Sequence, residues 1–253
     1  MSLRFHEIAE AGIRILNPFT PDRLARVGDI AQPTAATTML DLCCGEGEML
    51  CQWASQYGLH GTGIDLSQVF SANACKRAAE LGVSDQITIL QGDAAHYRDQ
   101  LSDPAQQFDI VSCIGATWIG DGLVGTLELM RPALKESSAS LLLIGEPFWN
   151  MEPTAAVLEA MGFSAEMYLT LPGTLQRIRN AGYTLLSMVL ADKNSWDRYE
   201  GDVWLNGFRW LDANPTDPDV NAFRDWLEGR QQSYFEIVRD YVGWGVFILR
   251  PTA

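Results

Sequence analysis

Short apolar runs alternate with stretches that repeat hydrophobic residues every three or four positions between residues 38 and 145. The apolar runs predict strands, and the stretches between them predict helices that pack on those strands. Because the runs are nearly continuous in hydrophobic residues, we expect a parallel sheet that helices cover on both faces. The predicted strands are 38–43, 61–65, 87–91, 108–114 and 140–145, and the predicted helices are 49–57, 67–81 and 122–135.

The rhythm changes after residue 146. A helix is predicted near 173–181, a sixth strand at 183–191 and a seventh at 241–250. The segment between the last two strands, 192–240, is too long for a bare connection and is expected to form helices of its own. Eleven of the 25 Phe, Trp and Tyr residues lie in 196–244. Such an aromatic insert is equally consistent with a lid that encloses a substrate and with the core packing of two added helices.

Charge and composition narrow the classes of function. The chain has 18 Lys and Arg against 32 Asp and Glu, a formal net charge of −14, which argues against binding to a nucleic-acid backbone. No apolar run approaches the ~20 residues that span a bilayer, and the N-terminus has no signal-peptide pattern. Five cysteines without a CxxC pair and three scattered histidines predict no metal site, and free thiols favour the cytoplasm.

Small and acidic residues gather where the predicted strands end. The first strand passes into Asp41-Leu42-Cys43-Cys44-Gly45-Glu46-Gly47, a turn in which glycine lets a ligand approach the backbone. Asp65 ends the second strand, where a carboxylate can accept hydrogen bonds from a ribose diol. Asp93 follows the third strand, and Ile114-Gly115-Ala116 closes the fourth. These positions share one edge of the sheet, which is where open α/β sheets bind ligands.

The turn does not match a dinucleotide fingerprint. A G-x-G-x-x-G motif aligned on Gly45 would require glycine at positions 43 and 48, where the chain has Cys43 and Glu48. A carboxylate at 48 would repel a pyrophosphate, whereas a cationic ligand would be attracted to the acids of this edge. S-adenosylmethionine (SAM) combines adenine, ribose, a sulfonium and an ammonium group without any phosphate. It therefore fits this chemistry better than NAD.

Four segments resemble motifs I to IV of class I SAM-dependent methyltransferases: DLCCGEGEML, GTGIDLS, QGDAA and FDIVSCIGATW. The resemblance is strongest over 38–149. Within this family, the chain is similar to bacterial methyltransferases whose substrate is unassigned. It implies a Rossmann-like, doubly wound α/β sheet of seven strands, mostly parallel with the last antiparallel. It also implies a cofactor set made of Asp41, Cys43, Gly45, Gly47, Asp65, Leu66, Asp93, Ala94, Ile114 and Gly115.

Two features of the chain depart from that pattern or resist interpretation. The family usually has glycine at position 43, and Cys43 makes a positive φ there less favourable, which would loosen cofactor binding. Asn17-Pro18-Phe19 superficially resembles the Asn-Pro-Pro-Tyr motif of DNA adenine methyltransferases. That motif follows the fourth strand, whereas this one precedes the first, so we do not expect the same role.

The acceptor side is less defined. Glu146 ends the fifth strand and is a candidate general base, substrate anchor or buried structural acid, while His96 is a weaker candidate base. Candidate pocket walls are Trp118, Glu146, Trp149, Trp196 and Tyr199. Transfer from a sulfonium is an in-line displacement that depends mainly on positioning, so a catalytic base is not required.

The expected organisation is an N-terminal helical cap (1–37), a core (38–191), a helical lid (192–240) and a final core strand (241–253). The expected activity is transfer of a methyl group from SAM, with S-adenosylhomocysteine (SAH) as product, to a small-molecule acceptor. Two alternatives stay open: an NAD(P)-dependent oxidoreductase and a non-catalytic SAM-binding protein. Neither the acceptor nor the oligomeric state follows from the sequence.

Overall fold

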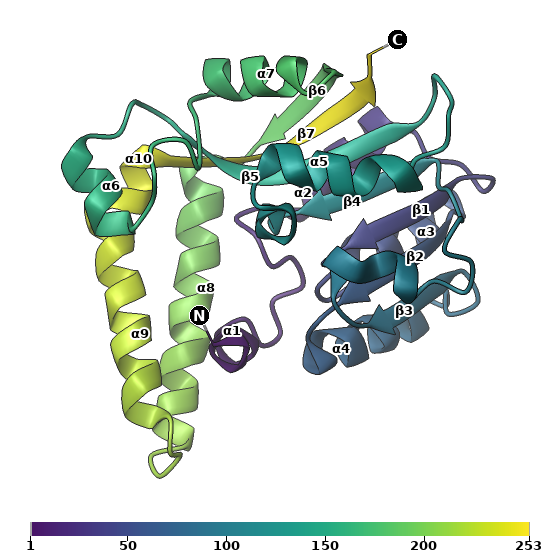
Figure 1. Cartoon of the computed structure of the whole chain (residues 1–253). Coiled ribbons are helices and arrows are strands. Elements are labelled where there is room, and N and C mark those ends of the chain that lie inside the picture. Colours follow the sequence, from purple (N-terminus) through teal and green to yellow (C-terminus); the bar gives the residue numbers. More distant parts are fainter. Residues whose placement is uncertain (1, 253) are drawn as a thin grey trace.

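A computed structural model describes residues 2–252, which form one seven-stranded sheet with the order β3-β2-β1-β4-β5-β7-β6 (Figure 1). The first five strands are mutually parallel, and β7 runs antiparallel to both β5 and β6. The strands are β1 (Thr38–Leu42), β2 (His60–Asp65), β3 (Ile87–Gln91), β4 (Ile110–Ile114), β5 (Leu141–Trp149), β6 (Tyr183–Leu190) and β7 (Val242–Pro251). The predicted fold class is confirmed.

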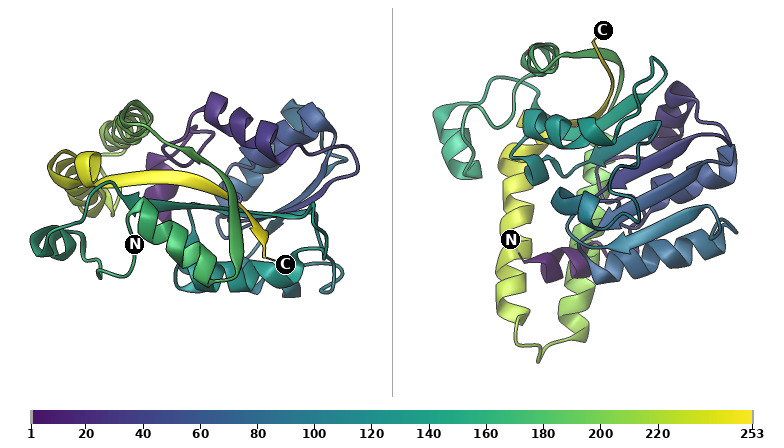
Figure 2. Two further views of the ribbon diagram at one scale, coloured as in Figure 1. Left: turned by 90° about the horizontal axis from the view of Figure 1, so that it is seen from above. Right: turned by 45° about the vertical axis from the view of Figure 1, so that its right-hand side comes forward.

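Helices cover both faces of this sheet (Figure 2). On one face α2 (Pro21–Ala31), α3 (Glu48–Tyr57) and α4 (Gln68–Glu80) enclose a core that contains Leu50 and Trp53. On the other face α5 (Leu123–Met130) and α7 (Leu171–Asn180) enclose a second core that contains Leu127 and Ile178. Two buried layers explain why the central strands have no exposed polar face.

Two predicted elements end elsewhere, for local reasons. β5 continues four residues beyond the predicted 145, to Trp149, because it pairs with β7 as far as Trp149↔Val242. Its partnership with β4 stops at Gly145, so Pro147 lies where one edge of the strand is free and a missing N–H is tolerated. Helix α5 ends at Met130 rather than 135, because Pro132 follows and the chain tightens into a short 3₁₀ turn.

The segment between β6 and β7 forms a helical hairpin of α8 (Lys193–Ala213) and α9 (Val220–Ser233). A π-helical turn at Tyr234–Val238 and the short α10 (Arg239–Tyr241) lead back to β7. The hairpin stands off the sheet at the end where β1 and β4 terminate, and α1 (Leu3–Ala9) lies beside α8 (Figures 1 and 2). Another short helix, α6 (Ala155–Met161), follows β5 and is absent from the prediction.

The hairpin and α1 share a hydrophobic core of their own. Ala9 of α1 and Val203, Phe223 and Leu227 of the hairpin are buried in it. Arg4 adds ion pairs to Asp217 and Asp219 at the turn between α8 and α9. Helix α1 is therefore attached to the hairpin rather than to the sheet. Among the helices of residues 2–252, none is both long and apolar enough to cross a bilayer.

Candidate functional site

The turn between β1 and α3 is built from left-handed backbone. Cys43, Gly45 and Gly47 have φ values of 60°, 54° and 66°. Cys43 has a positive φ although this conformation is unfavourable for a cysteine, because the turn imposes it. A left-handed L-residue costs roughly 1–2 kcal/mol, which the surrounding turn must offset. Gly45 also leaves room for a neighbour, since a Cβ there would lie 2.8 Å from Leu16 Cδ1.

Asp65 joins this turn to the end of β2. Its Oδ2 accepts a hydrogen bond from the Gly45 N–H (2.8 Å) and its Oδ1 accepts one from the Ser67 N–H (2.9 Å). Burial raises the pKa of the carboxyl group, and the two backbone N–H groups partly offset that rise. An ionised carboxylate offers about four lone-pair sites, so both oxygens retain capacity for a ligand's hydroxyl groups.

Asp41 is buried one strand away. The Ser112 hydroxyl of β4 donates to its Oδ1 at 2.5 Å. Burial raises the pKa of Asp41 to about 7, and the nearby Asp65 carboxylate adds to the rise. Burial therefore disfavours negative charge on Asp41, and a positively charged ligand bound beside Asp41 and Asp65 would favour the ionised form of both carboxyl groups.

The residues after β2 and β3 lie more openly. Leu66 is 59% exposed beside the buried Asp65. Asp93 caps the following 3₁₀ helix by accepting the Ala95 N–H, and its other oxygen pairs with His96 Nδ1 at 3.1 Å. These two interactions lower the pKa of Asp93, so the carboxylate is ionised. Ala94 next to it is buried. An exposed apolar side chain flanked by carboxylates is a suitable surface for a purine ring and its amino group.

His96 lies on the β3 side of the sheet and is exposed. In the sheet order, β2 and β1 separate β3 from β4. The structure therefore places His96 at the opposite end of the site from Ile114 and Gly115. The pairing of His96 with Asp93 explains its position, so a role in proton transfer is not needed to explain it.

A segment that sequence reasoning set aside lies against the end of β4. Residues 10–20, which we call the strap, run from α1 to α2 across the carboxyl edge of the sheet. The Asn17 side-chain amide lies against Gly115, where a Cβ would come within 2.2 Å of Asn17 Oδ1. Asn17 Nδ2 donates to the Ile114 carbonyl at 3.4 Å. Chain order had argued against a role at β4, but the fold brings Asn17 there from 97 positions away.

The strap is held on both sides. Phe19 is buried and packs edge-to-face on Trp244 of β7, and Arg198 of α8 donates to the Phe19 carbonyl at 2.7 Å. At its other end Glu10 accepts a 2.5 Å hydrogen bond from the Tyr199 hydroxyl of α8. Tyr199, predicted as an acceptor-side wall, therefore joins the hairpin to the strap.

Glu146 is buried near the end of β5. Burial raises its pKa to about 8, an effect that the Arg177 charge and the Thr117 hydroxyl partly offset. Its Oε2 has no hydrogen-bond partner among the described residues. An unpartnered buried carboxyl oxygen is rare in folded proteins, and a group with a pKa near neutrality is suited to exchanging a proton.

Aromatic side chains extend from Glu146 toward the hairpin. Burial raises the pKa of Tyr168, the charge of Glu146 raises it further, and Tyr168 packs on Phe163. Phe163 in turn packs on Trp149, and Trp196 of α8 packs against the same cluster. The indole N–H groups of Trp149 and Trp196 are buried without partners in the described structure. Trp149 and Trp196 thus share one cluster, whereas Glu146, three positions before Trp149 on β5, faces the side of the sheet that α7 covers.

Trp118 differs from them, because it is 71% exposed in the turn after β4. The core packing that the sequence allowed for the aromatic insert is present, and the lid stays a prediction. Phe223 and Trp226 pack on Phe5 of α1 within the hairpin's own core, whereas Trp196 faces the cluster near β5.

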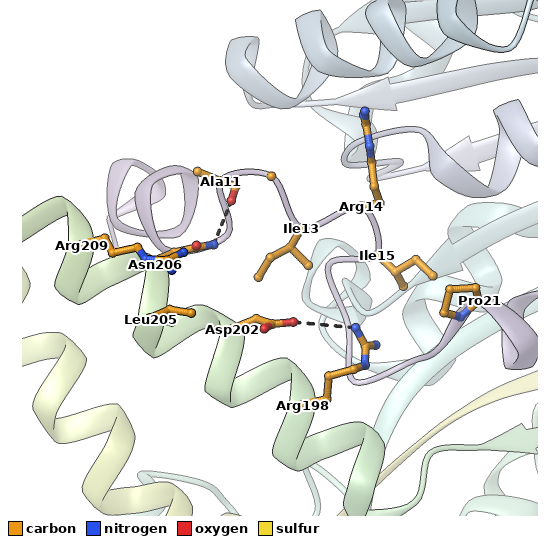
Figure 3. A pocket seen from close by; sticks show the side chains of 11 residues that line it. Ala11, Ile13, Arg14, Ile15, Pro21, Arg198, Asp202, Leu205, Asn206 and Arg209 are labelled. Atoms are coloured by element: carbon orange, nitrogen blue, oxygen red, sulfur yellow. Dashed lines mark hydrogen bonds and ion pairs between the residues drawn. The ribbon is translucent and has the colours of Figure 1, made fainter.

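A cavity of about 330 Å³ lies between the strap and α8 (Figure 3). Its lining includes Ile13, Pro21 and Leu205 but none of the predicted site residues. Its arginines do not converge: Arg14 extends away from α8, and Arg198 faces Asp202 (Figure 3). Arg14 instead reaches Glu46 in the turn after β1 (3.7 Å), so this cavity adjoins the acidic edge without containing any of its predicted residues.

Comparison with known proteins agrees with this geometry. Residues 39–137 match the family described as "Methyltransferase domain". The chain is 42% identical over 248 residues to the "Uncharacterized protein YjhP" of Escherichia coli (strain K12), covering 97% of both chains.

Two solved structures resemble the whole chain. One is a SAM-dependent methyltransferase from Geobacter sulfurreducens in complex with SAH, with a TM-score of 0.91 and 42% identity, covering 99% of this chain and 98% of that one. The other, from Thiobacillus denitrificans, is also in complex with SAH, with a TM-score of 0.90 and 43% identity over 99% of each chain. With the acidic edge and glycine turn described above, these likenesses show that the chain belongs to the class I SAM-dependent methyltransferases.

Proposed function

We propose that this methyltransferase acts on a small molecule, which it encloses between the end of β5 and the helical hairpin. The observation that carries the proposal is Glu146 Oε2, a buried carboxyl oxygen without a hydrogen-bond partner among residues 2–252. Trp149 Nε1 and Trp196 Nε1 are two further buried atoms without partners, in the cluster on the other face of β5. Folded proteins leave few such atoms unpaired, so a ligand with polar groups would satisfy them. Because all three atoms are shielded from solvent, a compact acceptor fits better than a polymer.

The cofactor would lie along the acidic edge. Gly45 and Gly47 give it access to backbone, Asp65 offers free lone pairs for ribose hydroxyls, and the exposed Leu66 offers an apolar face for adenine. The proposed cofactor set is the one that the motifs imply: Asp41, Cys43, Gly45, Gly47, Asp65, Leu66, Asp93, Ala94, Ile114 and Gly115. SAM fits these residues, because they offer hydrogen-bond acceptors and negative charge to a ligand that is cationic and lacks phosphate.

When bound, SAM supplies an electrophilic methyl group on a sulfonium. The protein's contribution is to hold the acceptor in line with that group and to exclude water, and positioning alone can supply roughly 7–11 kcal/mol. Trp149 and Trp196 would form apolar walls with N–H groups that orient the acceptor. Glu146 would exchange a proton with an acceptor that must lose one, since its pKa of about 8 lies near neutral pH.

The cysteines and the net charge bear on the cellular compartment and on the class of acceptor. We propose a cytoplasmic enzyme, because five cysteines remain free of disulfides in the structure. The charge of −14 disfavours nucleic acid as the acceptor.

The test is a turnover assay that detects SAH production from SAM with pooled metabolites, and separately with DNA, RNA and protein substrates. We expect SAH production only with a metabolite pool. Glu146→Gln should then lower kcat at least tenfold, whereas Glu159→Gln on the exposed face of α6 should leave it unchanged. Turnover with a polymer alone, or an unchanged kcat in Glu146→Gln, would contradict the proposal.

A further inference from the structure

The strap contacts the loops that follow two strands of the cofactor edge, and α1 contacts the loop that follows a third. Leu16 Cδ1 lies against Gly45 after β1, and the Asn17 amide lies against Gly115 after β4. Just before the strap, Glu7 of α1 accepts a 2.6 Å hydrogen bond from the Ser67 hydroxyl after β2. This segment, which belongs to none of the cofactor motifs, therefore forms a further wall of that edge.

Asn17 presents a free acceptor at this wall. Its Nδ2 is directed at the Ile114 carbonyl, which leaves Oδ1 as the available atom of the amide. No donor among residues 2–252 forms a hydrogen bond to Oδ1, and Asn17 is only half-buried. A free amide oxygen suits a donor that carries several N–H groups, as an ammonium does, and does not suit a sulfonium, which carries none.

The position of Asn17 is fixed before any ligand binds. Phe19 anchors the strap on Trp244, and Arg198 holds its backbone from α8. Gly115, with a φ of 85° and no Cβ, lets the amide approach the end of β4. A polar group held in place by its neighbours in this way is preorganised for binding.

We infer that Asn17 is a cofactor-binding residue, whose Oδ1 accepts a hydrogen bond from the α-ammonium group of the methionine part of SAM and SAH. The inference rests on the proposed cofactor set, which includes Gly45 and Gly115, the two residues that the strap contacts. It adds a ligand from the N-terminal strap to a site otherwise formed by the strand ends.

The experiment is calorimetric titration of the full chain with SAH and with 5′-methylthioadenosine, which has the same nucleoside and thioether but no amino acid. We expect Asn17→Ala to weaken SAH at least tenfold, because a hydrogen bond to a charged group contributes roughly 1.5–3 kcal/mol. Its affinity for 5′-methylthioadenosine should stay within twofold of the wild type. Asn17→Asp, which keeps an acceptor oxygen, should bind SAH within about threefold of the wild type.

Asn180→Ala, at the end of α7 and outside the site, is the matched control and should bind both ligands normally. Unchanged SAH affinity in Asn17→Ala would overturn the inference. Equal weakening of both ligands would also overturn it, since it would indicate a change in pocket shape. So would an Asn17→Asp variant that folds but is as impaired as Asn17→Ala. Failure of the wild type to bind SAH would instead refute the cofactor set itself.

Discussion

The two halves of the site are assembled differently. On the β1–β3 side, the defining contacts join residues close in sequence: Asp65 accepts from Gly45, 20 positions away, and Asp93 accepts from Ala95, two positions away. On the β4–β7 side, they join distant parts of the chain. Asn17 meets Ile114 across 97 positions, and Tyr199 meets Glu10 across 189. One half is set by local turns, and the other exists only once the whole chain has folded.

The chemistry of the two halves differs in the same way. The first half offers backbone N–H groups, glycine turns and carboxylates, which suit an unvarying ligand such as a cofactor. The second offers aromatic walls and polar atoms without partners, contributed by the hairpin and the end of β5. Substitutions in the second half can change the acceptor without disturbing the cofactor turns. Variants of either half test whether the two are separable in this way.

The largest effect is expected in the first half, from Asp65→Ala. The change removes the acceptor for two buried backbone N–H groups, and each unpaired group costs roughly 1–3 kcal/mol of stability. Loss of the proposed ribose contacts should also weaken SAH binding about 100-fold or more. Urea unfolding and calorimetry measure the two effects, with the exposed Asp85→Ala as a control from the same half. SAH affinity within threefold of the wild type would show that Asp65 has only a structural role.

A smaller effect is expected from the left-handed residue of the first turn. Cys43→Val should lower the free energy of unfolding by roughly 2 kcal/mol, because a β-branched residue is strained at a φ of 60°. Cys43→Gly should change it by less than about 1 kcal/mol, since relief of strain is offset by the flexibility of glycine in the unfolded chain. Urea denaturation of both variants measures the difference. Equal stability of the two would show that the turn relaxes to a negative φ.

The smallest effect on stability is expected in the second half of the site, from Glu146→Gln, and it appears as a change in the pH dependence of unfolding. The unfolded chain loses this proton near pH 4.5, whereas the folded chain keeps it to about pH 8. The folded state therefore binds more protons between these values, and stability falls as pH rises. Asp41 has the same sign and ionises at about pH 7 in the folded state, so both groups contribute from pH 7 to 8, and the part of the slope that Glu146→Gln removes is the share of Glu146.

In that range the wild type should lose up to about 1.4 kcal/mol per pH unit through this group, and Glu146→Gln should lose none of it. Denaturant unfolding at pH 7.0, 7.5 and 8.0 measures the slope. Glu159→Gln should keep the wild-type slope of unfolding free energy against pH. A slope as steep as that of the wild type in Glu146→Gln would show that another group causes it.

The sequence predicts the first half well because its signals are local. Strand β3 begins and ends at the predicted residues, and the turn from Asp41 to Gly47 lies at the end of β1 as expected. Those assignments need only apolar periodicity and glycine positions within a few residues of one another. The predicted roles of the individual cofactor residues stay predictions.

The second half escapes such reasoning for a physical reason. Neither periodicity nor composition reports which side chains meet when segments 100 residues apart pack together. Asn17-Pro18-Phe19 was visible as a motif, but its position before β1 gave no sign that the strap crosses the end of β4. The extension of β5 to Trp149 likewise depends on its antiparallel partner, which follows almost 100 residues later.

The root of the hairpin has a mechanical consequence. Both of its ends emerge from neighbouring strands, since Leu190 at the end of β6 pairs with Gly245 of β7. The two long helices thus share one narrow base, and α1 is clamped to their far tip through Arg4. A rotation about that base would carry α1 with it and pull on the strap, while every pairing within the sheet stayed intact. Moving the hairpin away from the end of β5 and loosening the strap beside Gly45 and Gly115 would then be one movement.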